Sequence, residues 1–155
     1  MIPSFIIIPG ALWPILPAGV FDASIDEVEK RFATTDKRRK LFVGLTKAVD
    51  NFFLSGCPQI FLDGSFVTAK PDPSDYDALW DSRFVDPALL DPVFLDFTHG
   101  TNPQKLKYLG EFFPVTAIEG GSRRSFFEFF QIEKQSGAPK GIIRISNHLK
   151  GGGKI

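Results

Sequence analysis

The sequence lacks several features that identify common protein classes. It has one cysteine, Cys57, in 155 residues, so no disulfide can form within the chain, and the apolar stretch around this thiol indicates a structural residue in a reducing compartment. Positive and negative side chains balance at zero formal charge, whereas dedicated nucleic-acid binders carry a basic excess. These absences favour a cytoplasmic protein that is neither a disulfide-rich secreted domain nor a simple nucleic-acid binder.

A long uninterrupted apolar run is also missing. The apolar start, MIPSFIIIPGALWPILPAG, has no basic region of the kind that begins a signal peptide, and four prolines interrupt it: Pro3, Pro9, Pro14 and Pro17. A membrane helix needs about 20 apolar residues without such breaks. We therefore predict a short strand or extended arm that packs on the domain, and no association with a membrane.

Several familiar catalytic motifs are absent as well. The chain contains no Gly-x-x-x-x-Gly-Lys-Ser/Thr loop, no Ser–His–Asp set and no Cys–His pair. His99 and His148 have no cysteine or histidine partner at zinc-binding spacing. The sequence therefore gives no support to a P-loop enzyme, a triad hydrolase or a zinc protein.

Phenylalanine, in contrast, is abundant. The chain has 17 phenylalanines, and eight of them form four adjacent pairs, at 52–53, 112–113, 126–127 and 129–130. Large aromatic side chains usually fill cores and interfaces. Because a domain this small cannot bury all of them, we expect some to form a partner surface.

The order of elements indicates a single α/β or α+β domain over residues 1–150, followed by a flexible tail at 151–155. Capping-box patterns and apolar spacing predict helices at 24–32, 36–54, 103–109 and 126 to about 134. Short apolar runs bounded by turn residues predict strands at 59–63, 78–80, 93–97 and 141–145. Helices and strands that mix in this way favour a mixed β-sheet with helices packed on it.

One segment combines residue types that suit phosphate and metal binding. The strand at 59–63 stops at Gly64 and Ser65, and Asp75 and Asp77 begin the next strand. Two residues apart in an extended chain, the two carboxylates point to the same face, about 6.5 to 7 Å apart along the strand. Mg²⁺ is commonly held by one or two carboxylates plus substrate phosphates, so the spacing suits Mg²⁺ or Mn²⁺.

The Gly64–Ser65 turn suits the phosphate side of the same site. Glycine lets the backbone approach a phosphate closely, the serine hydroxyl adds a donor, and the start of a following helix would add free N–H groups. Phosphoryl and nucleotidyl transfer need a metal-held polyphosphate and an aligned nucleophile rather than covalent work by the protein. A donor turn facing a carboxylate pair supplies both.

A strand that ends in Gly-Ser, followed after a spacer by Asp-x-Asp on the next strand, resembles the signature of the nucleotidyltransferase superfamily. A wider resemblance spans most of the chain and is to a bacterial family of single-domain proteins similar to minimal nucleotidyltransferases. It rests on Leu16-Pro17-Ala18-Gly19, Arg38-Arg39, DGSFVTAKPDPSDYDALWD, LLDPVFLDF, KYLGEFFPV, FFEFFQ and PKGIIRI. Those proteins tend to be encoded beside helix-turn-helix proteins, in an arrangement like a toxin–antitoxin pair.

The resemblance implies roles for individual residues. Gly64 and Ser65 would contact the triphosphate, Asp75 and Asp77 would bind Mg²⁺, and a third carboxylate on a later strand would complete a two-metal site. We assign that third role to Asp96, the one polar residue of the strand predicted at 93–97, with Glu128 as a weaker candidate. This sequence departs from the family pattern in its nine-residue spacer between Ser65 and Asp75 and in Ala69, where a glycine is frequent.

Other residues have both a functional and a structural interpretation. Asp63 either faces the site or caps the turn. Lys70 either neutralises phosphate charge or is solvated in its proline-rich turn. Arg123, with Arg124, either binds phosphate or lies in a solvated loop, and the basic run 37–40 is either an exposed helix face or an RNA contact.

The sequence thus predicts a metal-dependent nucleotidyltransferase that moves a nucleoside monophosphate from a nucleoside triphosphate to a hydroxyl of RNA, such as tRNA, or of a protein. By resemblance it would be the toxin-like component of a two-gene module with a helix-turn-helix partner. The alternative is an interaction module that keeps the fold, without transfer activity, and binds that partner. A nucleic-acid-binding structural protein is opposed by the neutral net charge.

Overall fold

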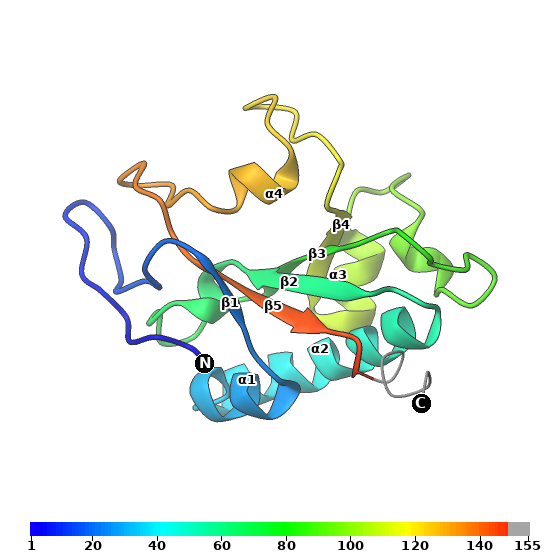
Figure 1. The fold of residues 1–155 in the computed structure, drawn as a ribbon, viewed down its shortest axis with the longest axis horizontal. Coiled ribbons are helices and arrows are strands. Elements are labelled where there is room, and N and C mark those ends of the chain that lie inside the picture. Colours follow the sequence, from blue (N-terminus) through cyan, green and yellow to red (C-terminus); the bar gives the residue numbers. More distant parts are fainter. Residues whose placement is uncertain (149–155) are drawn as a thin grey trace.

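A computed structural model describes residues 1–148, which form an α+β domain around one mixed five-stranded sheet (Figure 1). The strand order is β1-β5-β2-β3-β4. β1 pairs parallel with β5 and β3 with β4, whereas β2 runs antiparallel to both of its neighbours. The strands are β1 (Val20–Asp22), β2 (Gln59–Asp63), β3 (Tyr76–Trp80), β4 (Gly110–Pro114) and β5 (Ile142–Ser146).

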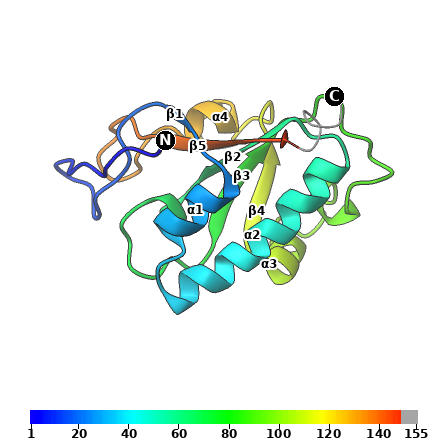
Figure 2. The same ribbon diagram turned by 60° about the horizontal axis from the view of Figure 1, so that its bottom comes forward.

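Three helices cover one face of the sheet (Figure 2). They are α1 (Ile25–Phe32), α2 (Asp36–Leu54) and α3 (Asn102–Tyr108). Ser24 caps α1 through a complete capping box with Glu27, and the Thr35 side chain accepts the Arg38 N–H at the start of α2. The sequence predictions for α1, α2, β2 and the bodies of β3 and β5 are confirmed.

The alternation of side chains along each strand separates two cores. On β3, Tyr76, Ala78 and Trp80 are buried in the main cluster with α1 and α2. Leu79 faces the other way and packs with Phe61 of β2 and the short helix α4 (Phe126–Phe129). The second, smaller cluster lies on the outer face of the sheet, which α4 and the chain around it cover (Figure 2).

The strand predicted at 93–97 is wrong. Pro92–Phe94 forms a one-turn 3₁₀ helix, η2, which begins where the Asp91 carboxylate accepts the Val93 N–H. Phe94 alone of this run is fully buried, stacked on Tyr108 with ring centroids 4.9 Å apart. The apolar run therefore anchors a loop, and its other side chains do not enter the sheet.

Other predictions are corrected in extent. The helix predicted to reach about Lys134 ends at Phe129, although its Ser125 cap is present. The extended start is confirmed in part, because Ile6 and Ile15 pair in a short antiparallel bridge. The tail at 151–155 lies outside the described residues. No helix within residues 1–148 is both long and apolar enough to cross a membrane.

Candidate functional site: a carboxylate-lined pocket on the outer sheet face

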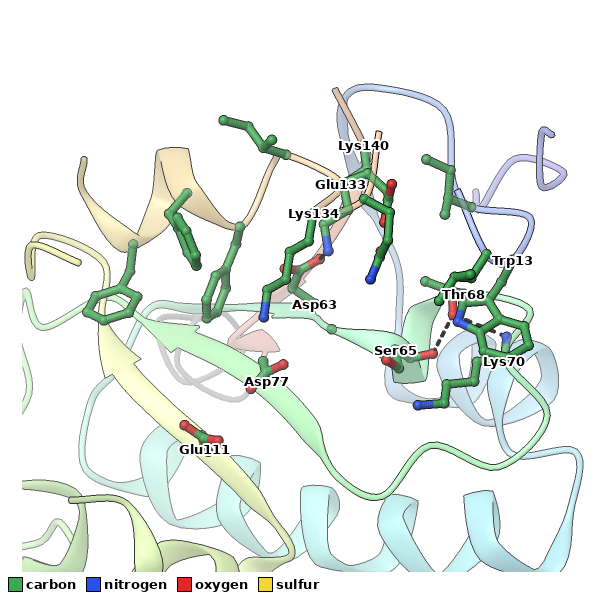
Figure 3. A pocket seen from close by; sticks show the side chains of 18 of the residues that line it. Trp13, Asp63, Ser65, Thr68, Lys70, Asp77, Glu111, Glu133, Lys134 and Lys140 are labelled. Atoms are coloured by element: carbon green, nitrogen blue, oxygen red, sulfur yellow. Dashed lines mark hydrogen bonds and ion pairs between the residues drawn. The ribbon is translucent and has the colours of Figure 1, made fainter. Parts of the chain in front are cut away.

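A cavity of about 510 Å³ lies on the outer face of the sheet, between the strands and the segment that carries α4. Figure 3 shows Asp63, Asp77 and Glu111 on three neighbouring strands, with Lys134 and Lys140 reaching toward them from the covering segment. Ser65, Thr68, Lys70 and Trp13 line the opposite end. The pocket thus has a carboxylate floor and a mixed, partly basic rim.

The turn after β2 brings backbone and carboxylate into close contact. Gly64 has φ +79° and ψ −170°, a conformation open essentially to glycine alone. A Cβ atom added to Gly64 would lie 2.4 Å from Oδ2 of Asp77, which is closer than such atoms approach. Glycine is therefore required here twice, for its backbone conformation and for the space that the Asp77 carboxylate occupies.

The expected helix after this turn is a single 3₁₀ turn, η1 (Ser65–Val67). The N–H of Val67 donates to the Gly64 carbonyl and that of Thr68 to the Ser65 carbonyl. Ser65 lines the pocket, as predicted from the sequence. The loop from Gly64 to Lys70 therefore forms one wall of the cavity through backbone and short polar side chains.

Asp77 and Glu111 form a register pair across the parallel strands β3 and β4. Both side chains line the pocket. Parallel neighbours are separated by about 4.8 Å, so the two carboxylates are held close by the sheet itself. Asp75 lies two residues before Asp77 and is connected to Glu111 through the Lys105 ammonium, which contacts both carboxylates.

Lys105 of α3 connects two of these acids. Its ammonium lies 3.0 Å from Oε1 of Glu111 and 3.5 Å from Oδ2 of Asp75. The hydrogen bond to Glu111 raises the pKa of Lys105. A cation of the protein itself is therefore bound between Asp75 and Glu111.

Asp63 is the most buried acid of the pocket, with a side chain 3% exposed. Its Oδ1 lies 3.2 Å from the Lys140 ammonium, but this contact lacks hydrogen-bond geometry, and Oδ1 has no hydrogen-bond partner among the described residues. Burial raises the pKa of Asp63, although the nearby Lys140 opposes that shift. The alternative in which Asp63 faces the site, rather than capping the turn, is the one observed.

The acidity of Asp77 is also strongly altered. Burial, followed by repulsion from Asp63, Asp75 and Glu111, raises the pKa of its carboxyl to about 7. Lys140 lowers it only in part. An added cation at this position would relieve the repulsion, and a strongly perturbed carboxyl in a cavity is typical of functional sites.

The family to which the chain belongs is given by a comparison with family models. The model of DUF6932, a family of unknown function, matches residues 12–146. The chain belongs to this family. Neither the search of curated proteins nor that of solved structures gives a match. The matched range includes every element of the sheet and every residue of the carboxylate floor in this DUF6932 protein.

The sequence predictions for single site residues have mixed outcomes. Gly64, Ser65, Asp77 and Lys70 all line the pocket, and Lys70 lies over the Trp13 ring at 5.9 Å from its centroid. Asp96 does not: it is exposed, and its carboxylate accepts hydrogen bonds from the backbone and hydroxyl of Thr98. The reason is the missing strand at 93–97, without which Asp96 has no place on the sheet.

Three further predicted residues also lie outside the pocket lining of the DUF6932 protein. Asp75 contacts Lys105 at the edge of the carboxylate group and does not line the cavity. Arg123 is exposed in the loop before α4, with φ +62°. Glu128 is the capping partner of Ser125, the structural role that the sequence already suggested. The basic run at 37–40 is not uniformly exposed either, since Arg38 is buried, with 4% of its surface exposed.

Glu111 lines the pocket and was missed by the sequence analysis. Its segment, Gly110–Pro114, alternates Glu111 and Phe113 with the buried Phe112, which is the period-two pattern of a half-buried strand. That signal was available. The pairing of this strand with β3 could not be predicted in the same way. The two parallel strands are joined by 29 residues, 81–109, and the local sequence pattern does not determine the path of that segment.

The pocket holds several carboxylates that are possible metal ligands. Within residues 1–148, no three histidine, cysteine, aspartate or glutamate side chains are spaced to hold an ion as they stand. The donor set nevertheless suits a hard cation, since the acids offer only oxygen ligands and their mutual repulsion is incompletely neutralised. The Lys105 ammonium, whose side chain is 41% exposed, occupies the space between Asp75 and Glu111 in this arrangement.

Proposed function

We propose that this protein is a metal-dependent nucleotidyltransferase, which moves a nucleoside monophosphate from a nucleoside triphosphate to a hydroxyl of RNA or protein. One observation supports it above all. Asp77 and Glu111 face each other across β3 and β4, beside a Gly64 that leaves room for the Asp77 carboxylate. A donor turn beside paired carboxylates is the arrangement that transfer from a polyphosphate requires.

In this proposal, polar and basic residues bind the phosphates, and acidic residues bind the metal ion. The Gly64–Ser65 turn and Lys70 bind the triphosphate, and Asp75, Asp77 and Glu111 hold Mg²⁺ or Mn²⁺, which neutralises phosphate oxygens when bound. The acceptor oxygen forms a bond to the α-phosphorus, the bond to the β-phosphate breaks, and pyrophosphate leaves. The hydroxyl proton passes to a carboxylate, for which Glu111 takes the role first assigned to Asp96.

The test is transfer of label from α-phosphate-labelled nucleoside triphosphates. The protein is incubated with each triphosphate, Mg²⁺, and either total tRNA or protein acceptors that include a helix-turn-helix partner. We expect Asp77→Asn and Glu111→Gln to abolish labelling, because each keeps its shape but removes a charge. Asp96→Asn is the matched control and should label like the unaltered chain. Full labelling in the first two variants, or its loss in the third, would contradict the assignment.

A second candidate function has its own supporting observation. The ammonium of Lys105 already bridges Asp75 and Glu111, as a bound cation would. This arrangement favours a module that binds a nucleotide or a partner protein without transfer. It predicts a higher melting temperature with Mg²⁺ and a nucleoside triphosphate, since a ligand specific for the native state stabilises it, but no labelled product with any acceptor.

A further inference from the structure

Arg38 of α2 makes an unusual set of contacts for a buried charge. It is 4% exposed, and its guanidinium donates hydrogen bonds to backbone carbonyls rather than to a carboxylate. The acceptors, with distances from the donor nitrogen, are Phe32 (3.1 Å), Ser65 (3.4 Å), Phe66 (2.6 Å), Thr68 (2.8 Å), Lys70 (2.5 Å) and Pro71 (3.3 Å).

Four of these six carbonyls belong to the 64–70 loop, which forms one wall of the pocket, and a fifth, that of Pro71, follows the loop directly. The fork of the guanidinium fits this concave run of oxygens, whereas a lysine ammonium offers fewer and less directed donors. Ser65, Thr68 and Lys70 face the cavity from the same loop (Figure 3). Arg38 itself does not line the pocket, so any effect on a ligand passes through the loop.

Phe66 and Val67 also anchor the loop, because their side chains are buried in the main core. Thr68 Oγ1 donates to the Ser65 carbonyl and accepts the Lys70 N–H. The loop contains one 3₁₀ turn, and its remaining backbone bonds include the Ala69 N–H to the Pro14 carbonyl. Carbonyls turned toward Arg38 leave the opposite side of the loop free to face the cavity.

We propose that Arg38 is a positioning residue that holds the 64–70 loop in the conformation that receives a polyphosphate. The identity of the ligand as a polyphosphate rests on the proposed function. The claim that Arg38 orders the loop does not depend on it. Arg38 touches no substrate in this account. It fixes where Ser65 and Lys70 stand, and its removal loosens a wall of the pocket while the sheet with its carboxylates stays intact.

Arg31 of α1 provides a matched control. Its guanidinium also donates to backbone carbonyls, those of Ile2 (3.3 Å) and Pro3 (2.7 Å), and it packs over the Phe5 ring at 4.5 Å. It contacts no residue of the 64–70 loop by any of these bonds. Arg31→Ala therefore removes a similar group from a neighbouring helix, with the pocket wall untouched.

The first measurement needs no ligand. Hydrogen exchange is followed at the amides of Val67, Thr68 and Ala69 in the unaltered chain, in Arg38→Ala and in Arg31→Ala. We expect exchange at these amides to rise about tenfold or more in Arg38→Ala only, since hydrogen bonds to a charged group are the stronger kind. Unchanged exchange in a folded Arg38→Ala protein would overturn the inference. Should that variant fail to fold, Arg38→Lys replaces it, with a smaller increase expected.

The second measurement follows ligand binding through Trp13. This side chain lines the pocket beside Lys70, whereas Trp80, the other tryptophan of the chain, is 3% exposed in the core. The probe is inorganic triphosphate with Mg²⁺, which lacks the absorbance of a base. We expect about tenfold or greater weakening of binding in Arg38→Ala and little change in Arg31→Ala. Added methylguanidinium should restore binding in the first variant.

The two measurements separate the inference from the proposed function. If the unaltered chain does not bind Mg²⁺ with triphosphate, the proposed function fails, and the exchange data alone decide the role of Arg38. If the unaltered chain binds and Arg38→Ala binds equally well, the positioning role is wrong and the proposed function stands.

Discussion

The two faces of the central sheet are built from the same strands and differ in what they contain. Toward α1 and α2, β3 presents Tyr76, Ala78 and Trp80 to a packed apolar core. Toward α4, the same strand presents Asp77 and Leu79, one charged and one apolar, to a cavity and a smaller aromatic cluster. The difference shows that alternate residues of one strand can have separate roles. One set packs in the core and specifies the fold, and the residues between them line the candidate site.

The largest effect expected from this comparison is on stability. Phe52 is fully buried on the helix-covered face, with ring centroids 4.3, 5.1 and 5.3 Å from Phe94, Phe112 and Trp80. Phe52→Ala should lower the free energy of unfolding by about 3 to 5 kcal/mol, because it leaves a cavity in a close-packed core. Denaturant titration measures this.

The matched substitution on the outer face is Phe126→Ala. Phe126 is partly exposed and stacks on Phe113 at 4.1 Å between ring centroids. We expect a loss of only about 1 to 2 kcal/mol, since less area is buried and one stacked pair is removed. Equal losses in the two variants would show that both faces contribute alike to the core, against the comparison drawn here.

The effect expected at Gly64 lies between those of the two phenylalanine substitutions. Gly64→Ala should cost about 2 to 3 kcal/mol, since alanine strains the backbone at φ +79° and its Cβ meets the Asp77 carboxylate. Gly137 is the matched control: it has φ +73°, and an added Cβ there meets no atom within 4 Å. Gly137→Ala should cost about 1 kcal/mol. Thermal unfolding of the two variants isolates the contact with Asp77, and equal costs would disprove it.

The last prediction concerns the pH dependence of stability on the outer face. An aspartate in the unfolded chain ionises near pH 4, whereas the pKa of Asp77 in the native protein is raised to about 7. Between these values the native state binds more protons than the unfolded state, so this residue makes stability fall as pH rises. Asp77→Asn should therefore gain melting temperature relative to the unaltered chain from about pH 4 to about pH 7, with no further gain above that.

Asp96→Asn serves as the control for this pH dependence. Hydrogen bonds from Thr98 lower the pKa of Asp96, so its contribution to stability has the opposite sign. This variant should lose, and not gain, relative stability as pH rises through the acid range. A flat difference between Asp77→Asn and the unaltered chain across this range would mean that Asp77 ionises normally.

The sequence predicted the helix-covered face better than the outer one, for a physical reason. The spacing of apolar residues and the caps at Ser24 and Thr35 are local signals, and both α2 and β2 were predicted to the residue. The apolar run at 93–97 misled, because its composition suits a strand while Pro92 and the Asp91 cap begin a 3₁₀ turn instead. Composition alone does not separate the two.

The candidate site was predictable only where its residues are close in sequence. Gly64, Ser65 and Asp77 lie within one strand–turn–strand unit, so their proximity follows from local geometry. Glu111 depends on a parallel pairing, Lys105 on the docking of α3, and Lys140 on the path of the segment above the sheet. Each of these contacts depends on tertiary structure, which local sequence patterns do not predict.

The in-register pairing of Asp77 with Glu111 also bears on how this protein can change over time. Backbone hydrogen bonds between β3 and β4 set the separation of the two acids, whereas residues 81–109 return the chain to the neighbouring strand and anchor it to the core through Phe94 and Tyr108. Insertions or replacements at exposed positions of that stretch, such as Arg83 and Phe84, should therefore leave the spacing of the acids unaltered. Insertions and deletions in surface loops, which are the most variable kind of sequence change, should therefore not alter the distance between Asp77 and Glu111.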